Sequence, residues 1–144
     1  MSENFQIKVS LKTILVIDDD YGMTDLLKHM LAKLGYKALS ASNCVEGLKL
    51  LEKNKIDCVI LDLSMPQVSG YQFLMAHKKL DSIKHVPVIV LSAKNRTDDV
   101  QKAMELGANA YMKKPIDEKI LSFHMDKIVP NHYSANLTSE VSWI

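Results

Sequence analysis

The chain has 144 residues, a length that favours one globular domain, since domains commonly have about 100–200 residues. Hydrophobic residues make up 47% of the sequence and charged residues 24%, which excludes a disordered chain. The formal net charge is +1, so no overall basic field exists to attract nucleic acid or an anionic membrane. No apolar run approaches the roughly 20 residues of a membrane span, and the polar start shows no secretory signal, so we expect a cytoplasmic protein. Cys44 and Cys58 have no metal-binding or redox spacing and are expected to be reduced core thiols.

Apolar patterning along residues 12–129 alternates between two kinds of segment. Short continuous apolar runs, typical of strands buried on both faces, alternate with longer segments whose apolar residues recur at helical spacing. In chain order the pattern predicts a strand over 13–17, a helix over 23–34, a strand over 36–41, a helix after Asn43, a strand over 57–61, a helix around 73–77, a strand over 86–91, a helix over 97–106, a strand over 110–112 and a helix over 117–129. Gly35 and Gly107 are predicted to end two of the helices. Residues 1–11 are a weakly patterned lead-in, and residues 130–144 a polar tail.

This alternation of strands and helices predicts the fold class. Strands separated by single helices form βαβ units, which give a parallel sheet with helices on both faces, an α/β fold. Right-handed crossovers then produce a doubly wound (βα)5 sandwich. In such folds ligands bind beyond the carboxyl ends of the strands, so the residues at those ends are the candidates for function.

Polar side chains follow four of the five predicted strands. The ends of the first, third, fourth and fifth strands carry Asp18-Asp19-Asp20, Asp62, Ser92 and Lys114. Because the strands are parallel, these carboxylates, the hydroxyl and the ammonium are expected on one rim of the sheet. Two carboxylates about 4 Å apart repel by roughly 1–4 kcal/mol, so the acids need more positive charge than one lysine brings. An all-oxygen ligand set beside an open cleft suits Mg²⁺, and the constellation is suited to phosphoryl transfer, in which a carboxylate can be the nucleophile.

Four segments resemble the motifs of response-regulator receiver domains, which have a CheY-like, flavodoxin-like fold. They are ILVIDDD, VILDLSMPQVSG, VIVLSAK and AYMKKP. The resemblance covers residues 12–129, and the motifs occur in the family's order and at its spacing. It implies a five-stranded parallel sheet of order 2-1-3-4-5.

The resemblance also implies a phosphoacceptor and a metal site. Asp62 would accept the phosphoryl group. Mg²⁺, or Mn²⁺, would be held by Asp18, Asp19, Asp62 and the backbone carbonyl of Ser64. Asp20 stands where the family often has Glu, and it receives no ligand role.

Three further residues would respond to the phosphoryl group. By resemblance, Lys114 would contact it and the Ser92 hydroxyl would hydrogen-bond it. Tyr111 matches the switch aromatic that moves with that hydroxyl, and Pro115 matches a proline whose peptide bond is cis in the family.

The resemblance further implies the kinds of partner. The phosphoryl donor would be a sensor histidine kinase or a histidine phosphotransfer protein, and the output a downstream protein target. Residues 130–144 are too few for a DNA-binding output domain, so we expect no direct contact with nucleic acid, and none with a membrane. The chain is expected to act alone or as a receiver cut from a longer protein, and as a monomer or a phosphorylation-dependent dimer.

Alternatives remain for the residues and for the function. Asp18 and Asp19 could cap the first helix, Ser92 and Lys114 could be an ordinary strand-end hydroxyl and a solvent-facing lysine, and Tyr111 could serve sheet packing. A metal-dependent phosphohydrolase of the haloacid-dehalogenase type would use Asp98-Asp99 as its late acid pair. The fold class alone would also allow a flavin carrier.

Overall fold

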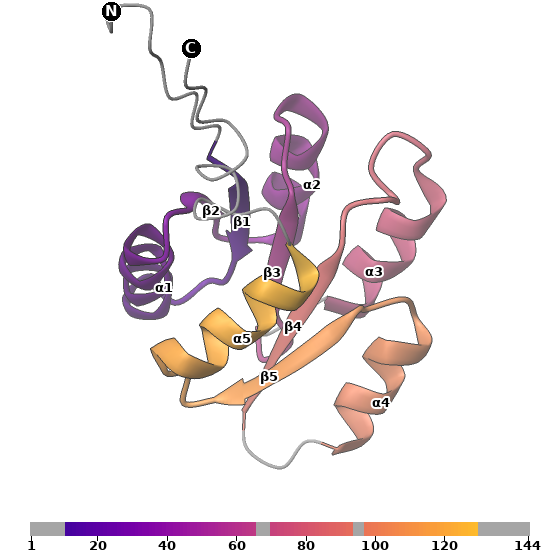
Figure 1. Cartoon of the computed structure of the whole chain (residues 1–144). Coiled ribbons are helices and arrows are strands. Elements are labelled where there is room, and N and C mark those ends of the chain that lie inside the picture. Colours follow the sequence, from indigo (N-terminus) through magenta and orange to yellow (C-terminus); the bar gives the residue numbers. More distant parts are fainter. Residues whose placement is uncertain (1–10, 66–69, 94–96, 130–144) are drawn as a thin grey trace, which may run out of the picture.

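The computed structural model describes residues 11–65, 70–93 and 97–129 (Figure 1). The predicted tail and residues 1–10 of the predicted lead-in lie outside the described residues. Strands and helices alternate through the described part as β1 (Thr13–Ile17), α1 (Tyr21–Lys33), β2 (Lys37–Ala41), α2 (Cys44–Lys53), β3 (Cys58–Asp62), α3 (Gly70–Lys79), β4 (Val88–Ala93), α4 (Thr97–Glu105), β5 (Ala110–Lys114) and α5 (Glu118–Ile128). Every predicted element is therefore present.

The five strands form one parallel sheet in the order β2-β1-β3-β4-β5. This confirms both the predicted fold class and the order that the family resemblance implied. β1 and β3 are neighbouring strands inside the sheet. Their carboxyl ends lie next to each other, since Ile17 pairs with Leu61. On the other side of β3, Asp62 pairs with Leu91 of β4.

Helices cover both faces of the sheet (Figure 1), and an apolar core lies beneath them on each face. On one face, alternate strand residues such as Leu15 and Val59 pack with the buried side chains of α2, α3 and α4. On the other face, the intervening residues, such as Val16 and Ile60, pack with α1 and α5. Burial on both faces explains why the central strands read as continuous apolar runs rather than as alternating patterns.

The ends of some elements differ from the prediction. β5 continues beyond the apolar residues to Lys114, because Ser92 and Ala93 of β4 go on pairing with Lys113 and Lys114. Backbone pairing does not depend on apolar side chains, so the hydrophobic pattern ended too early. Gly35 and Gly107 follow α1 and α4 with φ of 94° and 111°, a left-handed conformation that favours glycine, as their predicted role in ending helices requires.

Neither cysteine forms a disulfide: Cys58 is buried and Cys44 half-buried. Burial raises the pKa of the Cys44 thiol to about 11, so this thiol stays protonated at neutral pH. Among the described helices, none combines the length and the apolar composition that crossing a bilayer requires.

Candidate functional site

Three carboxylates meet at the carboxyl ends of β1 and β3. Asp18 and Asp19 follow β1, and Asp62 is the last residue of β3. One oxygen of each lies within 4.8 Å of the others. Asp18 and Asp62 are each 3% exposed, whereas Asp19 is exposed. The two strands therefore bring together the acids that the sequence placed at their ends.

Asp18 occupies the most buried part of this acidic cluster. Its amide donates to the Ala41 carbonyl at 3.1 Å, which extends the pairing of β1 with β2 and turns its side chain inward. Its Oδ1 accepts from the Asp20 amide at 3.0 Å, but its buried Oδ2 has no hydrogen-bond partner among the described residues. Burial, reinforced by the charge of Asp62, raises the pKa of Asp18 to about 7. An orphaned carboxylate oxygen among other oxygen donors fits a hard divalent cation.

Asp62 is engaged at both of its oxygens. Oδ1 accepts from the Ser64 amide at 2.8 Å, which holds the start of the following loop beside the carboxylate. Oδ2 lies 3.3 Å from Lys114 Nζ, an ion pair whose lysine side chain is 22% exposed. Lys114 reaches this position because β5 continues to its carboxyl end at the same rim. The arrangement presents the Asp62 carboxyl group with the Lys114 ammonium beside it.

Ser92 and Tyr111 differ in their surroundings. Ser92 is 2% exposed and directly follows Leu91, the residue of β4 that pairs with Asp62. Tyr111 on β5 is 47% exposed, so its ring lies largely on the surface. The peptide bond between Lys114 and Pro115 is cis, as the resemblance implied.

The capping role considered for Asp18 and Asp19 belongs to Asp20. The Asp20 carboxylate accepts from the amides of Gly22 at 2.8 Å and Met23 at 3.3 Å, which makes it the N-cap of α1. Asp is a common N-cap residue, but the predicted helix over 23–34 began two residues too late to point to Asp20.

The acid pair of the phosphohydrolase alternative lies elsewhere. Asp98 and Asp99 are in the first turn of α4 and do not join the cluster of Asp18, Asp19 and Asp62. That alternative therefore gains no support from the geometry.

Comparison with known proteins agrees with this geometry. The family model described as the response regulator receiver domain matches residues 14–125. Sporulation initiation phosphotransferase F of Bacillus subtilis (strain 168) is 32% identical over 117 residues, which cover 81% of this chain and 93% of that protein. The uncharacterized transcriptional regulatory protein YbdJ of the same strain is 34% identical over 120 residues, but the match covers only 52% of its length. The crystal structure of a response regulator receiver domain protein from Clostridium thermocellum superposes with a TM-score of 0.76 at 36% identity, covering 83% of this chain and 94% of that one.

Proposed function

The chain belongs to the response regulator receiver domain family, whose members accept phosphoryl groups in two-component signalling, and on this premise we propose that Asp62 is its phosphoacceptor. The observation that carries the proposal is the setting of Asp62. Its carboxylate is buried within 4.8 Å of two other carboxylates, and the Lys114 ammonium lies 3.3 Å away. A buried acid among acids, with one cation beside it, is suited to attack an electrophilic phosphorus once further positive charge is present.

The transfer reaction balances without any further reactant. A sensor histidine kinase or a histidine phosphotransfer protein presents a phosphohistidine. An oxygen of Asp62 forms the new O–P bond, and the N–P bond breaks with its electron pair remaining on the histidine nitrogen. The donor's imidazole leaves as a neutral group because its other ring nitrogen carries a proton. Lys114 offsets the negative charge that reaches Asp62, and the Ser92 hydroxyl donates a hydrogen bond to a phosphoryl oxygen.

The donor set of the site favours Mg²⁺ or Mn²⁺ as the cofactor. The orphaned Oδ2 of Asp18 and the oxygen-only ligands fit a hard cation, and Asp18, Asp19, Asp62 and the backbone carbonyl of Ser64 would hold it. When bound, the ion supplies positive charge beside the transferring phosphoryl oxygens.

Phosphorylation would act on protein contacts. It adds about −1.5 to −2 charge at Asp62, which shifts the population of a two-state element that includes the buried Ser92 and the exposed Tyr111. The similarity to sporulation initiation phosphotransferase F supports a function in which the phosphoryl group passes between proteins. The output is then a downstream protein, with the chain acting as a monomer or a phosphorylation-dependent dimer.

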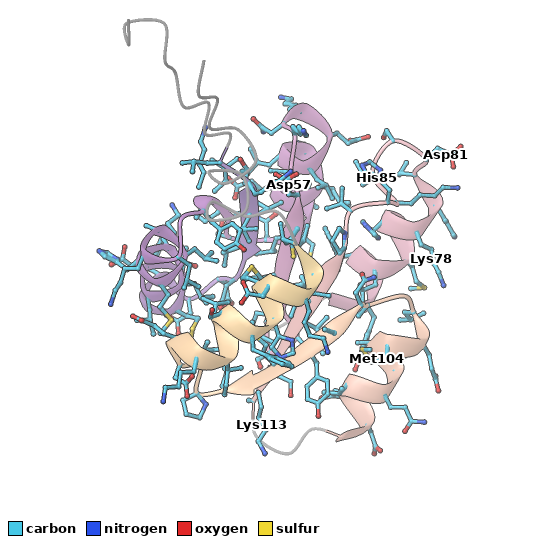
Figure 2. The ribbon with its side chains drawn as sticks, viewed as in Figure 1. Asp57, Lys78, Asp81, His85, Met104 and Lys113 are labelled. Atoms are coloured by element: carbon cyan, nitrogen blue, oxygen red, sulfur yellow. The ribbon has the colours of Figure 1, made fainter. Side chains whose placement is uncertain are left out.

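The proposal is tested by incubating the full chain with acetyl phosphate and Mg²⁺ and measuring its intact mass. The wild type is expected to gain one phosphoryl group and Asp62→Asn none. Asp57→Asn is the matched control, because Asp57 directly precedes β3 whereas Asp62 ends it. Figure 2 shows Asp57 at the opposite end of the molecule from Lys113, the neighbour of Lys114. Equal mass gain in the wild type and Asp62→Asn, or no gain in either, would refute the assignment.

A further inference from the structure

A polar link joins α3 to α4 outside the acidic cluster. The Tyr71 hydroxyl donates to Asp99, lying 3.1 Å from the carboxylate Oδ1 and 3.3 Å from the backbone carbonyl. The Lys102 ammonium lies 4.5 Å from the centroid of the Tyr71 ring, within the range of a cation–π contact. One half-buried tyrosine thus makes contacts with two residues in the first two turns of α4.

The link joins the first turns of α3 and α4. Tyr71 is the second residue of α3, the helix that follows the strand carrying Asp62. Asp99 is the third residue of α4, the helix that follows the strand carrying Ser92. The hydrogen bond therefore ties together the beginnings of the two helices that follow β3 and β4, the strands that carry Asp62 and Ser92.

The described part of α4 buries fewer side chains than its neighbouring helices do. Of its side chains over residues 98–105, only that of Ala103 is buried. By contrast, α3 buries Phe73 and Leu74, and α5 buries Leu121 and Met125. Val100 is half-buried and Leu106, which directly follows α4, packs against the core, so the polar link adds to a modest apolar contact between α4 and the rest of the fold.

We propose that the Tyr71–Asp99 hydrogen bond is a positioning contact that holds α4 in the arrangement of the unphosphorylated chain and thereby slows phosphorylation of Asp62. The inference rests on the proposed function, in which Ser92 follows the phosphoryl group on Asp62. Ser92 lies near the end of β4, and Asp99 lies in the first turn of the helix that follows, seven residues later in the chain.

The length of the hydrogen bond and the arrangement that it stabilises determine whether it slows or speeds phosphorylation of Asp62. A hydrogen bond weakens steeply beyond its normal length, so a shift of α4 by about 1 Å relative to α3 breaks it. A contact that exists only before phosphorylation stabilises the unphosphorylated arrangement. If phosphorylation proceeds from the arrangement in which the contact is broken, the contact lowers the population that reacts and so slows the reaction.

The test uses the full chain and compares initial rates of phosphoryl gain from acetyl phosphate with Mg²⁺, followed by intact mass. Tyr71→Phe keeps the ring over which Lys102 lies and removes only the hydroxyl, and Asp99→Ala removes the acceptor carboxylate. Both are expected to react about 2-fold to 10-fold faster than the wild type, the range that corresponds to one hydrogen bond. The double variant is expected to react no faster than Tyr71→Phe, since the hydroxyl makes both contacts with Asp99, to its carboxylate and to its backbone carbonyl.

Two further variants separate the hydrogen bond from charge and helix stability. Asp99→Asn keeps an oxygen that can accept from Tyr71 and is expected to retain the wild-type rate. Asp98→Ala removes an exposed carboxylate from the same helical turn and is also expected to leave the rate unchanged. If Asp98→Ala reacts as fast as Asp99→Ala, the effect is one of helix charge and the proposal is wrong.

The same measurements separate the role of the Tyr71–Asp99 hydrogen bond from the role of Asp62 as phosphoacceptor. If the wild type is phosphorylated on Asp62 but Tyr71→Phe and Asp99→Ala are not faster, the positioning contact is refuted while the phosphoacceptor assignment stands. A lower melting temperature with an unchanged rate means that the contact is only structural, which also refutes it. If the wild type gains no phosphoryl group on Asp62, the proposed function fails and the inference with it.

Discussion

Replacing Asp18 by Asn removes a charge that the fold buries unfavourably. Asp18 is 3% exposed, and an Asp62 oxygen lies within 4.8 Å of it. In the part of the chain that the structure describes, no group hydrogen-bonds its Oδ2. Without a divalent cation, burial and the charge of Asp62 raise the pKa of Asp18 from 3.8 to about 7. A rise of this size corresponds to roughly 4 kcal/mol against the ionised folded state at pH 8. Since Asn keeps the shape without the charge, we expect Asp18→Asn to raise the free energy of unfolding by about 2–4 kcal/mol in EDTA at pH 8.

The sign of the pH dependence follows from the same change in pKa. Between about pH 4 and pH 7 the folded wild type holds a proton on Asp18 that the unfolded chain has lost. The free energy of unfolding of the wild type in EDTA therefore receives a contribution that falls as pH rises through this window. Asp18→Asn lacks that contribution, so its advantage over the wild type is expected to be smaller at pH 5 than at pH 8.

Urea denaturation followed by far-ultraviolet circular dichroism measures both quantities. Asp81→Asn is the matched control, because Asp81 is exposed beyond the end of α3 and pairs only with Lys84, at 2.9 Å, among the salt bridges of the described residues (Figure 2). It is expected to change the free energy of unfolding by no more than about 0.5 kcal/mol. Millimolar Mg²⁺ is expected to raise the melting temperature of the wild type and to have little effect on Asp18→Asn. The reasoning is refuted if Asp18→Asn is less stable than the wild type in EDTA at pH 8, or if the difference is the same at pH 5.

Three further variants test other parts of the chain in the same urea assay. Asp20→Ala removes the N-cap of α1 and is expected to lower the free energy of unfolding by about 1 kcal/mol. Mg²⁺ is expected to raise the melting temperature of this variant as it does for the wild type. Loss of that increase would make Asp20 a metal ligand. Burial lowers the pKa of His77, whose Nε2 lies 2.8 Å from the Val86 carbonyl. Below about pH 6.5 the unfolded chain therefore binds more protons than the folded chain. The free energy of unfolding then falls as the pH is lowered, by at most about 1.4 kcal/mol per pH unit. The free energy of unfolding of His77→Gln should fall less steeply with decreasing pH than that of the wild type. Identical slopes would show that His77 does not cause the loss. A Cβ added at Gly47 would lie 2.5 Å from Ile17 Cδ1, so Gly47→Ala is expected to lose about 1–3 kcal/mol, and a variant as stable as the wild type would show that Ile17 moves aside freely.

Much of the fold could be predicted because its signals are local or follow from topology. The runs at Thr13–Ile17 and Cys58–Asp62 are buried on both faces of the sheet, and that burial is what a continuous apolar run records. Once the strands are parallel, their carboxyl ends share one rim. The meeting of Asp18 and Asp19 with Asp62 therefore follows from chain order. The order of the strands came from the family resemblance, and the observed sheet confirms it.

The end of β5 could not be predicted in the same way. Lys113 and Lys114 carry no apolar signal, yet their backbones pair with Ser92 and Ala93. Pairing of this kind depends on where the neighbouring strand lies, which the residues of β5 alone do not encode.

By itself, the sequence determined that acids, a hydroxyl and a lysine would meet at one edge of a parallel sheet, because the periodicity of burial and the direction of the strands are enough for that conclusion. Only the tertiary structure decided how three consecutive aspartates divide their tasks: Asp18 is buried beside Asp62, Asp19 is exposed, and Asp20 caps α1. Only the packing of α3 against α4 decided that Tyr71 would reach Asp99, 28 residues away. Such contacts depend on side-chain direction and on distances of a few ångströms between elements, and a linear pattern of apolar and polar residues carries neither.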